Sequence, residues 1–154
     1  MNTQQDSAST SAARSREHAI YKPNKRGSGG VVRFELNRAK ECIFVEAARQ
    51  SGPKQFDWEH KLIMKWGMAD IGEALAVLGG RSPAAKMFHK TEGANSTFEL
   101  ACGSDPERAP YRFSLSRQNS ASGEVRRISV PLTHAEAATL ETLLRTAVVR
   151  LMRW

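Results

Sequence analysis

Residues 125–153 read VRRISVPLTHAEAATLETLLRTAVVRLMR, and this stretch decides the fold because a strand, a helix start signal and an amphipathic helix follow one another directly. Val125 to Leu132 is typical of a strand. In Thr133-His134-Ala135-Glu136, the first and fourth side chains can satisfy free backbone N–H groups at a helix start, which is a capping box. The predicted helix runs to about Arg153. Its apolar stripe consists of Leu140, Leu144, Ala147, Val148 and Leu151.

Three more strands are predicted before this unit, over residues 85–90, 96–102 and 111–118. Polar or glycine-containing turns separate them at 93–95, 103–110 and 119–123. The second half of the chain is therefore predicted to fold as four strands followed by a helix.

The first half shows the same order. A strand is expected around Tyr21, and others over 31–36, 41–49 and 55–66, the last with strict alternation of apolar and polar residues. The period then changes to that of a helix over 68–78, which Gly79-Gly80 ends. The fold class is accordingly α+β, with two four-stranded antiparallel sheets that are each followed by a helix.

Composition favours a polyanionic partner. The 154 residues carry 23 Lys and Arg against 16 Asp and Glu, a net charge of +7. Such a surplus is common in nucleic-acid-binding proteins, although a solvated basic surface without a partner is the alternative. No stretch approaches the roughly 18 apolar residues that span a bilayer, so no membrane partner is expected.

The first residues, 1–17, are rich in Ser, Thr, Ala and Gln and are expected to form a disordered polar tail before a single domain over 18–154. Arg14 and Arg16 among serines give a faint mitochondrial presequence signal, against which Asp6 and Glu17 argue. The expected location is intracellular, cytoplasmic or nucleoid, with the mitochondrial matrix as the alternative.

Neither catalysis nor a cofactor is expected. The sequence has no phosphate-binding glycine loop, no Gly-x-Ser-x-Gly and no His-Glu-x-x-His. Its four histidines are dispersed, and Cys42 and Cys102 are expected to be buried free thiols, so no metal-ligand spacing exists.

The arrangement of aromatic and cationic residues favours an unpaired nucleic-acid strand. Cations neutralise phosphates, and flat side chains stack on bases. For Phe34, Phe44, Phe98 and Phe113 a core position is expected, because they lie in the apolar register, and Trp154 is expected to be packed. The candidate nucleic-acid-binding residues are Tyr21, Lys22, Lys25, Arg26, Arg33, Phe56, Trp58, Lys61, Lys65, Lys86, Arg112 and Arg117.

Four short motifs in the same order resemble the Whirly family and the related trypanosomatid guide-RNA-binding proteins. The motifs are Phe56-Asp57-Trp58-Glu59-x-Lys61, Asp70-Ile71-Gly72-Glu73, Lys86-Met87-Phe88-His89 and Ser129-Val130-Pro131-Leu132-Thr133-x-Ala135-Glu136.

This resemblance implies two sheets packed crosswise and a homotetramer with the helices at its centre. It also implies single-stranded DNA bound with little sequence preference between the sheets of neighbouring protomers. Matched to the family, Tyr21, Lys22 and Lys25 correspond to a basic first-strand motif, and Phe56, Trp58 and Lys61 to an aromatic and basic fourth strand.

Two alternatives remain open. One is an RNA-binding and annealing protein of the same fold, since no side chain is assignable to a 2′-hydroxyl. The other is a structural or protein-interaction module whose basic surface is incidental.

Overall fold

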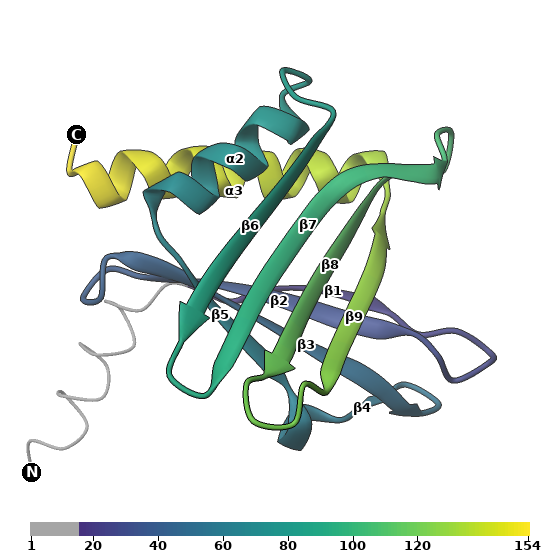
Figure 1. The fold of residues 1–154 in the computed structure, drawn as a ribbon. Helices are drawn as coiled ribbons and strands as arrows, with labels where there is room; N and C mark the ends of the chain where they lie inside the picture. The colour runs from purple at the N-terminus through teal and green to yellow at the C-terminus, as the bar shows by residue number, and fades with distance from the viewer. Residues whose placement is uncertain (1–15) are drawn as a thin grey trace, which may run out of the picture.

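Two antiparallel sheets cross each other, and two helices lie along one side of them (Figure 1). The coordinates are a computed structural model that describes residues 16–154, so the tail expected over 1–17 lies, up to residue 15, outside the described residues. The first half of the chain supplies one sheet and α2, and the second half supplies the other sheet and α3. The predicted pair of crossed sheets, each followed by a helix, is confirmed.

The first sheet runs β1–β2–β3, with β5 paired to the other edge of β3 and the short β4 paired to the end of β3. A single 3-10 turn, η1, connects β4 to β5. The elements of this half are β1 His18–Lys22, β2 Gly30–Asn37, β3 Cys42–Gly52, β4 Gln55–Phe56, η1 Trp58–His60, β5 Leu62–Trp66 and α2 Met68–Leu78.

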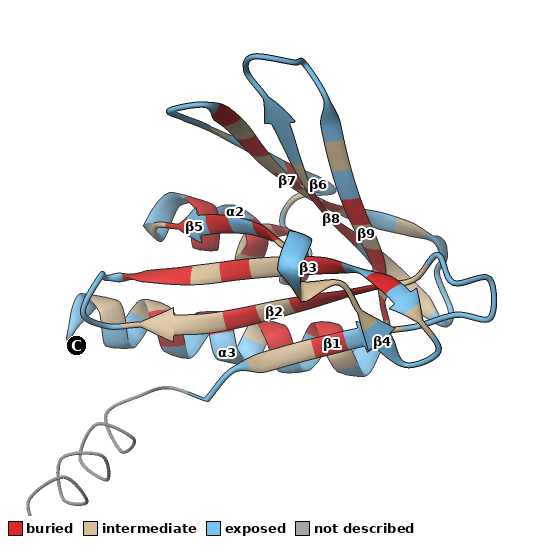
Figure 2. Cartoon of the chain, turned by 90° about the horizontal axis from the view of Figure 1, so that it is seen from below, coloured by how far each residue is buried: buried red, intermediate tan, exposed pale blue. Residues whose placement is uncertain are grey.

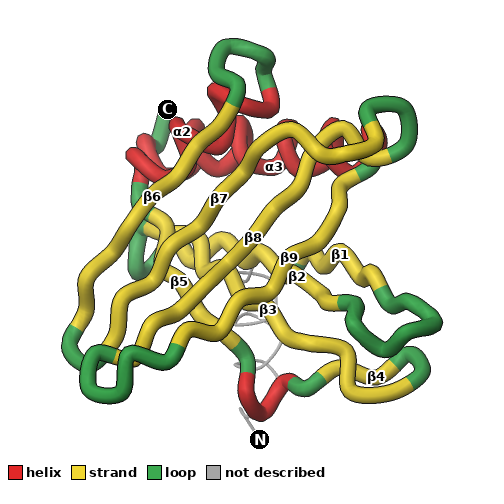
Figure 3. The backbone as a smooth tube through the Cα atoms, turned by 45° about the vertical axis from the view of Figure 1, so that its right-hand side comes forward, coloured by secondary structure: helices red, strands yellow, loops and turns green. Residues whose placement is uncertain are grey.

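The second sheet runs in sequence order, and its strands are joined by three hairpin connections. The tube in Figure 3 shows how its strands cross those of the first sheet. Its elements are β6 Ala84–Thr91, β7 Ala94–Asp105, β8 Ala109–Asn119, β9 Val125–Leu132 and α3 His134–Met152. Among residues 16–154, no helix is both long and apolar enough to cross a membrane.

The prediction of one continuous strand over 55–66 was wrong. The strand β4 covers only Gln55–Phe56, and a bulge in β3 between Gln50 and Gly52 interrupts its pairing with β4. The chain then turns through η1 before β5 begins. His60 Nδ1 lies 2.9 Å from a carboxylate oxygen of Asp57, a contact that closes the turn. Alternation alone did not reveal this break because the polar and apolar pattern continues through the turn residues.

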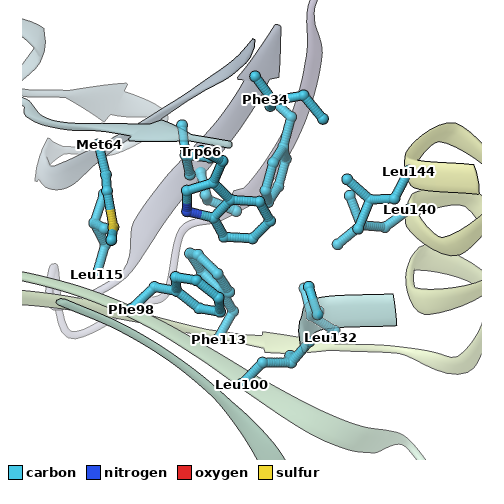
Figure 4. Close-up of a cluster of buried hydrophobic side chains, with 14 of the residues drawn as sticks. Phe34, Met64, Trp66, Phe98, Leu100, Phe113, Leu115, Leu132, Leu140 and Leu144 are labelled. Atoms are coloured by element: carbon cyan, nitrogen blue, oxygen red, sulfur yellow. The ribbon is translucent and has the colours of Figure 1, made fainter. Parts of the chain in front are cut away.

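The core lies between the crossed sheets and is closed on one side by α3 (Figure 4). The Trp66 ring centroid is 4.3 Å from that of Phe98, and Phe34 meets both Trp66 and Phe113 edge-on. Leu140 of α3 is 1 % exposed and closes this cluster. The predicted core positions of Phe34, Phe98 and Phe113 are confirmed.

Three other burial predictions were wrong. Phe44 is paired with Glu35 and Lys65, which places it on the outer face of the first sheet, with the Lys40 ammonium 5.4 Å from its ring centroid. Cys102 is exposed near the end of β7, whereas Cys42 is buried, and burial raises the pKa of the Cys42 thiol. Trp154 is 93 % exposed because it lies beyond the last turn of α3.

The predicted capping box at the start of α3 is confirmed. Thr133 Oγ1 accepts a hydrogen bond from the Glu136 N–H at 3.1 Å, and Glu136 Oε1 accepts one from the Thr133 N–H at 2.9 Å. The Lys22 ammonium also lies 2.6 Å from Glu136 Oε1, so β1 is tied to the helix start. Burial would raise the pKa of Glu136, but the hydrogen bonds from Lys22 and Thr133 outweigh it and hold the pKa below its ordinary value.

Candidate nucleic-acid interface

The outer face of the first sheet carries a row of aromatic and cationic side chains. Figure 2 shows the strands of this sheet from below. Side chains alternate between the faces of a strand. With Val32, Phe34 and Leu36 on the core side, Tyr21, Arg33 and Phe44 fall on the opposite side. The cross-strand neighbours of Arg33 on this face are Ala19 and Glu46, and Glu46 in turn pairs with Ile63.

Glu46 organises the middle of this face. Its carboxylate accepts hydrogen bonds from the Arg33 guanidinium at 2.6 Å and lies 2.5 Å from the Lys61 ammonium. Burial would raise the pKa of Glu46, but the hydrogen bonds and charges of Lys61 and Arg33 lower it below its ordinary value. Glu46 is therefore ionised at neutral pH and neutralises part of the charge of both cations.

Trp58 is placed over Arg33 by η1. The Arg33 guanidinium carbon lies 4.2 Å from the Trp58 ring centroid, a cation–π contact that fixes the orientation of the indole. Trp58 is half-buried, so part of its ring remains open to a ligand. A flat, partly exposed indole next to a cation is suited to stacking a base near its phosphate.

A second aromatic pair lies at the β1 edge of the same sheet. The Tyr21 and Phe56 ring centroids are 5.5 Å apart, and the rings are inclined at 51°. Tyr21 is 55 % exposed, which is high for an aromatic side chain within a strand. Its exposed ring adds a second stacking surface at the β1 edge of this face.

The outer face of the second sheet is polar and cationic. Cross-strand register brings Lys86, Glu99, Ser114 and Ser129 into one row. Glu99 accepts from the Arg127 guanidinium at 3.0 Å, and its other oxygen lies 3.3 Å from the Lys86 ammonium. This face thus contains one carboxylate that holds two cations, as on the first sheet.

Phe88 adds an aromatic ring to the second face, on the edge strand β6. It is 59 % exposed and pairs in register with Thr97. Arg112, also exposed, donates a hydrogen bond to Ser129 Oγ at 2.9 Å. The second face therefore combines cations, hydroxyl groups and one exposed ring.

Helix α3 presents apolar side chains away from the core. Leu143, Val149 and Met152 are each between 44 % and 50 % exposed. A groove of about 260 Å³ lies between this helix and the first sheet, with Leu36 and Leu143 among its lining residues. Leu143, Val149 and Met152 of α3 therefore remain exposed beside the first sheet.

Comparison with known sequences identifies the family. The sequence model of the Whirly transcription factor family matches residues 25–143, well over half of the chain. The chain belongs to the Whirly family. The resemblance derived from the four sequence motifs is thereby confirmed.

The similar proteins include one curated relative, the chloroplastic single-stranded DNA-binding protein WHY1 of Solanum tuberosum. It is 24 % identical over 126 residues, and the match covers 79 % of this Whirly chain and 45 % of the relative. The chain therefore spans less than half the length of that relative.

Two solved structures show the same fold. WHY3 from Arabidopsis thaliana superposes with a TM-score of 0.73 at 19 % identity, covering 91 % of this chain and 90 % of that one. A guide-RNA-binding protein complex bound to a guide RNA superposes with a TM-score of 0.63 at 20 % identity, covering 91 % and 94 %.

The Whirly fold brings eight of the predicted residues together on or beside the two outer faces. Tyr21, Arg33, Phe56, Trp58, Lys61 and Lys65 belong to the first sheet and its η1 connection, and Lys86 and Arg112 belong to the second sheet. Lys25 and Arg26 lie in the loop between β1 and β2.

Two predicted residues are placed elsewhere. Lys22 is in register with Gly30 on the side that faces α3, where Glu136 holds it. Arg117 is in register with Ser96 and Arg126 on the core side, at the exposed end of the second sheet. Neither therefore faces outward with the other cations.

The candidate list missed several residues. Phe44 and Phe88 were assigned to the core or left out, although their registers place them on the outer faces. Arg127 could have been found from the sequence. Because Phe113 and Leu115 point into the core, Ser116 points outward, and so does Arg127, which pairs with it. Glu46 gave no such signal, because its role depends on cations from two other elements.

Proposed function

We propose that this chain binds single-stranded nucleic acid, with single-stranded DNA as its ligand, and that it does so without catalysis. The observation that carries the proposal is the grouping of Tyr21–Phe56 and Arg33–Trp58 on one sheet face. Membership of the Whirly family and the name of the Solanum tuberosum relative support it.

The geometry favours an unpaired strand for a physical reason. Stacking on an aromatic ring requires a base whose flat face is uncovered, and in a duplex the neighbouring base pairs cover it. Each stacked base contributes roughly 1–3 kcal/mol whatever its identity, so little sequence preference is expected. Cations such as Lys65 and Arg112 supply the phosphate attraction, which depends on salt.

Intrinsic fluorescence tests the stacking directly. The chain has three tryptophans, of which Trp66 is fully buried and Trp154 is almost fully exposed. In a Trp154→Phe variant, Trp58 is the partly exposed fluorophore. Adding an oligothymidylate should quench its emission, and the quench should disappear when Trp58 is also changed to Phe. Binding without any quench would contradict stacking at Trp58.

We also propose that the protein is a homo-oligomer, a tetramer, assembled through its helices. Support comes from the exposed apolar side chains of α3, Leu143, Val149 and Met152, and from Met68 at the start of α2, which is 41 % exposed. Replacing Leu143 and Val149 with Ser should lower the mass measured by light scattering to that of a smaller species. An unchanged mass would place the interface elsewhere.

RNA is the second candidate ligand. It is supported by the fold shared with the guide-RNA-binding complex. Competition between DNA and RNA oligonucleotides of matched sequence distinguishes the two ligands. Stronger competition by RNA would make RNA the principal ligand.

A further inference from the structure

A hollow of about 550 Å³ lies at one end of the first sheet, between the β1–β2 loop and the β3–β4 turn. The two connections extend side by side from the same end of the sheet in Figures 1 and 3. The lining residues are Pro23, Asn24, Lys25, Arg26, Gly27, Gln50, Gly52, Pro53 and Lys54. A hollow of this volume is in the range that holds a small ligand, such as one nucleotide unit.

The charge of the hollow is positive and uncompensated. Lys25, Arg26 and Lys54 line it, and none of its lining residues is a carboxylate. Within residues 16–154, none of these three cations forms an ion pair, in contrast to Lys22, Arg33 and Lys61, which carboxylates hold. Three uncompensated cations around one hollow attract an anion.

Gln50 holds the two loops in place. It is 9 % exposed, and its Oε1 accepts hydrogen bonds from the N–H groups of Asn24 at 2.9 Å and Gly29 at 3.0 Å. Its Nε2 donates to the carbonyl oxygens of Asn24 at 3.1 Å and Gly52 at 3.2 Å. One side chain thus satisfies backbone groups of both loops, so the hollow is formed before any ligand arrives.

Gly29 is required by this close approach. A Cβ atom at this position would lie 2.0 Å from the Lys22 carbonyl oxygen and 2.7 Å from Gln50 Oε1. Any larger residue would push the β1–β2 loop away from Gln50. The loop is therefore built to stay against the β3–β4 turn.

The hollow adjoins the exposed aromatic pair. Tyr21 precedes Pro23 by two residues, and Phe56 follows Lys54 by two residues, so the strands that carry the pair lead directly into both loops. A base stacked on Tyr21 would bring its phosphate next to the cations of the hollow.

We propose that this hollow is a phosphate-binding subsite, in which Lys25, Arg26 and Lys54 neutralise one phosphate of the bound strand. Gln50 is the positioning residue that keeps the two loops at the right separation. The phosphate is either a terminal monoester or an internal diester. This inference rests on the proposed binding of single strands and adds Lys54 and Gln50 to the residues that take part.

The first test measures the salt dependence of oligothymidylate binding for Lys54→Gln, with Arg81→Gln as the control. Arg81 is exposed in the turn between α2 and β6 and does not line the hollow, and its replacement removes one positive charge, as Lys54→Gln does. Each phosphate contact with a single strand contributes about 0.7 to the slope of log affinity against log salt. The slope should fall by about 0.7 in Lys54→Gln and stay the same in Arg81→Gln. Equal slopes in the two variants would overturn the subsite.

The second test addresses Gln50. Gln50→Leu removes all four hydrogen bonds and should reduce the salt slope as Lys54→Gln does. The double variant should lose little more than either single variant, because both changes disable one site. Additive losses would show that Gln50 affects binding independently of Lys54 and would overturn its positioning role. Thermal unfolding of each variant reports the effect on stability separately.

Two further arms identify the phosphate and separate this inference from the proposed function. An oligothymidylate with a 5′-phosphate is compared with the same strand ending in a 5′-hydroxyl. A preference that Lys54→Gln abolishes indicates a terminal phosphate, and equal binding indicates an internal one.

Pyrophosphate is also titrated at constant ionic strength. It should shift the NMR signals of the Gly27 and Lys54 amides even if no strand binds. Strand binding without any pyrophosphate shift would overturn the subsite and leave the proposed function intact.

Discussion

Replacing Glu46 with Gln should tighten the binding of a single strand while it destabilises the fold. The Glu46 carboxylate holds Arg33 at 2.6 Å and Lys61 at 2.5 Å, so both cations are partly neutralised before a strand arrives. Its lowered pKa means that the neutralising charge is fully present at neutral pH. Glutamine keeps the size of the side chain and removes that charge.

The magnitude follows from the number of cations released. Each new phosphate contact adds about 0.7 to the slope of log affinity against log salt. Between 1 M and 0.1 M salt, one or two such contacts therefore correspond to about 5-fold to 25-fold tighter binding at 0.1 M. The stability cost comes from the loss of charged hydrogen bonds, each of which contributes roughly 1.5–3 kcal/mol. Because Arg33 and Lys61 retain some exposure to water, we expect a loss near the lower end of that range.

The assay is fluorescence anisotropy with a labelled oligothymidylate over a range of salt concentrations, together with urea unfolding of the free protein. Glu107→Gln is the matched control, because Glu107 lies exposed in the β7–β8 connection and its loss changes the net charge by the same amount. Weaker binding by Glu46→Gln than by the control, with the fold intact, would contradict this prediction. It would show that Glu46 aligns Arg33 for the ligand instead of competing with it.

Four further outcomes are expected. Trp58→Ala should weaken single-strand binding by about 5-fold to 150-fold in the same assay, since one stacked base contributes roughly 1–3 kcal/mol; a loss below 2-fold would exclude stacking there. Lys65→Glu should also weaken binding and flatten its salt dependence, whereas unchanged binding would favour an incidental basic surface. Glu136 has a lowered pKa, so its contribution to stability is complete above its unfolded pKa of about 4.3 and is lost as the pH falls through the folded value. Glu136→Gln should therefore flatten the dependence of the unfolding free energy on pH in that acidic window. An unchanged profile would contradict the ion pair with Lys22. Phe98→Ala, at a fully buried site, should lower the free energy of unfolding by about 3–5 kcal/mol in urea, and a loss below 1 kcal/mol would contradict the packing against Trp66.

The secondary structure was predictable from sequence wherever the signal is local. The capping box at Thr133 and Glu136 fixes the start of α3, because its hydrogen bonds join residues only three positions apart. Alternation in β9 follows directly from its one buried face. The break at Trp58–His60 was missed because a 3-10 turn can carry the same alternation as a strand.

The candidate site was only partly predictable, since its geometry depends on contacts between residues far apart in the chain. Strand parity over 55–66 predicted Trp58 on the same side as Trp66, but Trp66 is buried in the core and Trp58 lies over Arg33 on the outer face, because η1 interrupts the strand. The pairing of Lys22 with Glu136, 114 positions away, could not be seen in the sequence. The same is true of Gln50, whose partner Asn24 is 26 positions away.

The most direct test of single-strand binding compares the affinity of the whole chain for a labelled single strand with its affinity for a duplex of the same length and sequence. The measurement is anisotropy at several salt concentrations. The single strand should bind more tightly at every salt concentration, and the Trp58→Ala variant should lose most of the difference. Equal or tighter binding of the duplex would contradict it, because the aromatic rings of the first sheet face would then have no uncovered base to stack on.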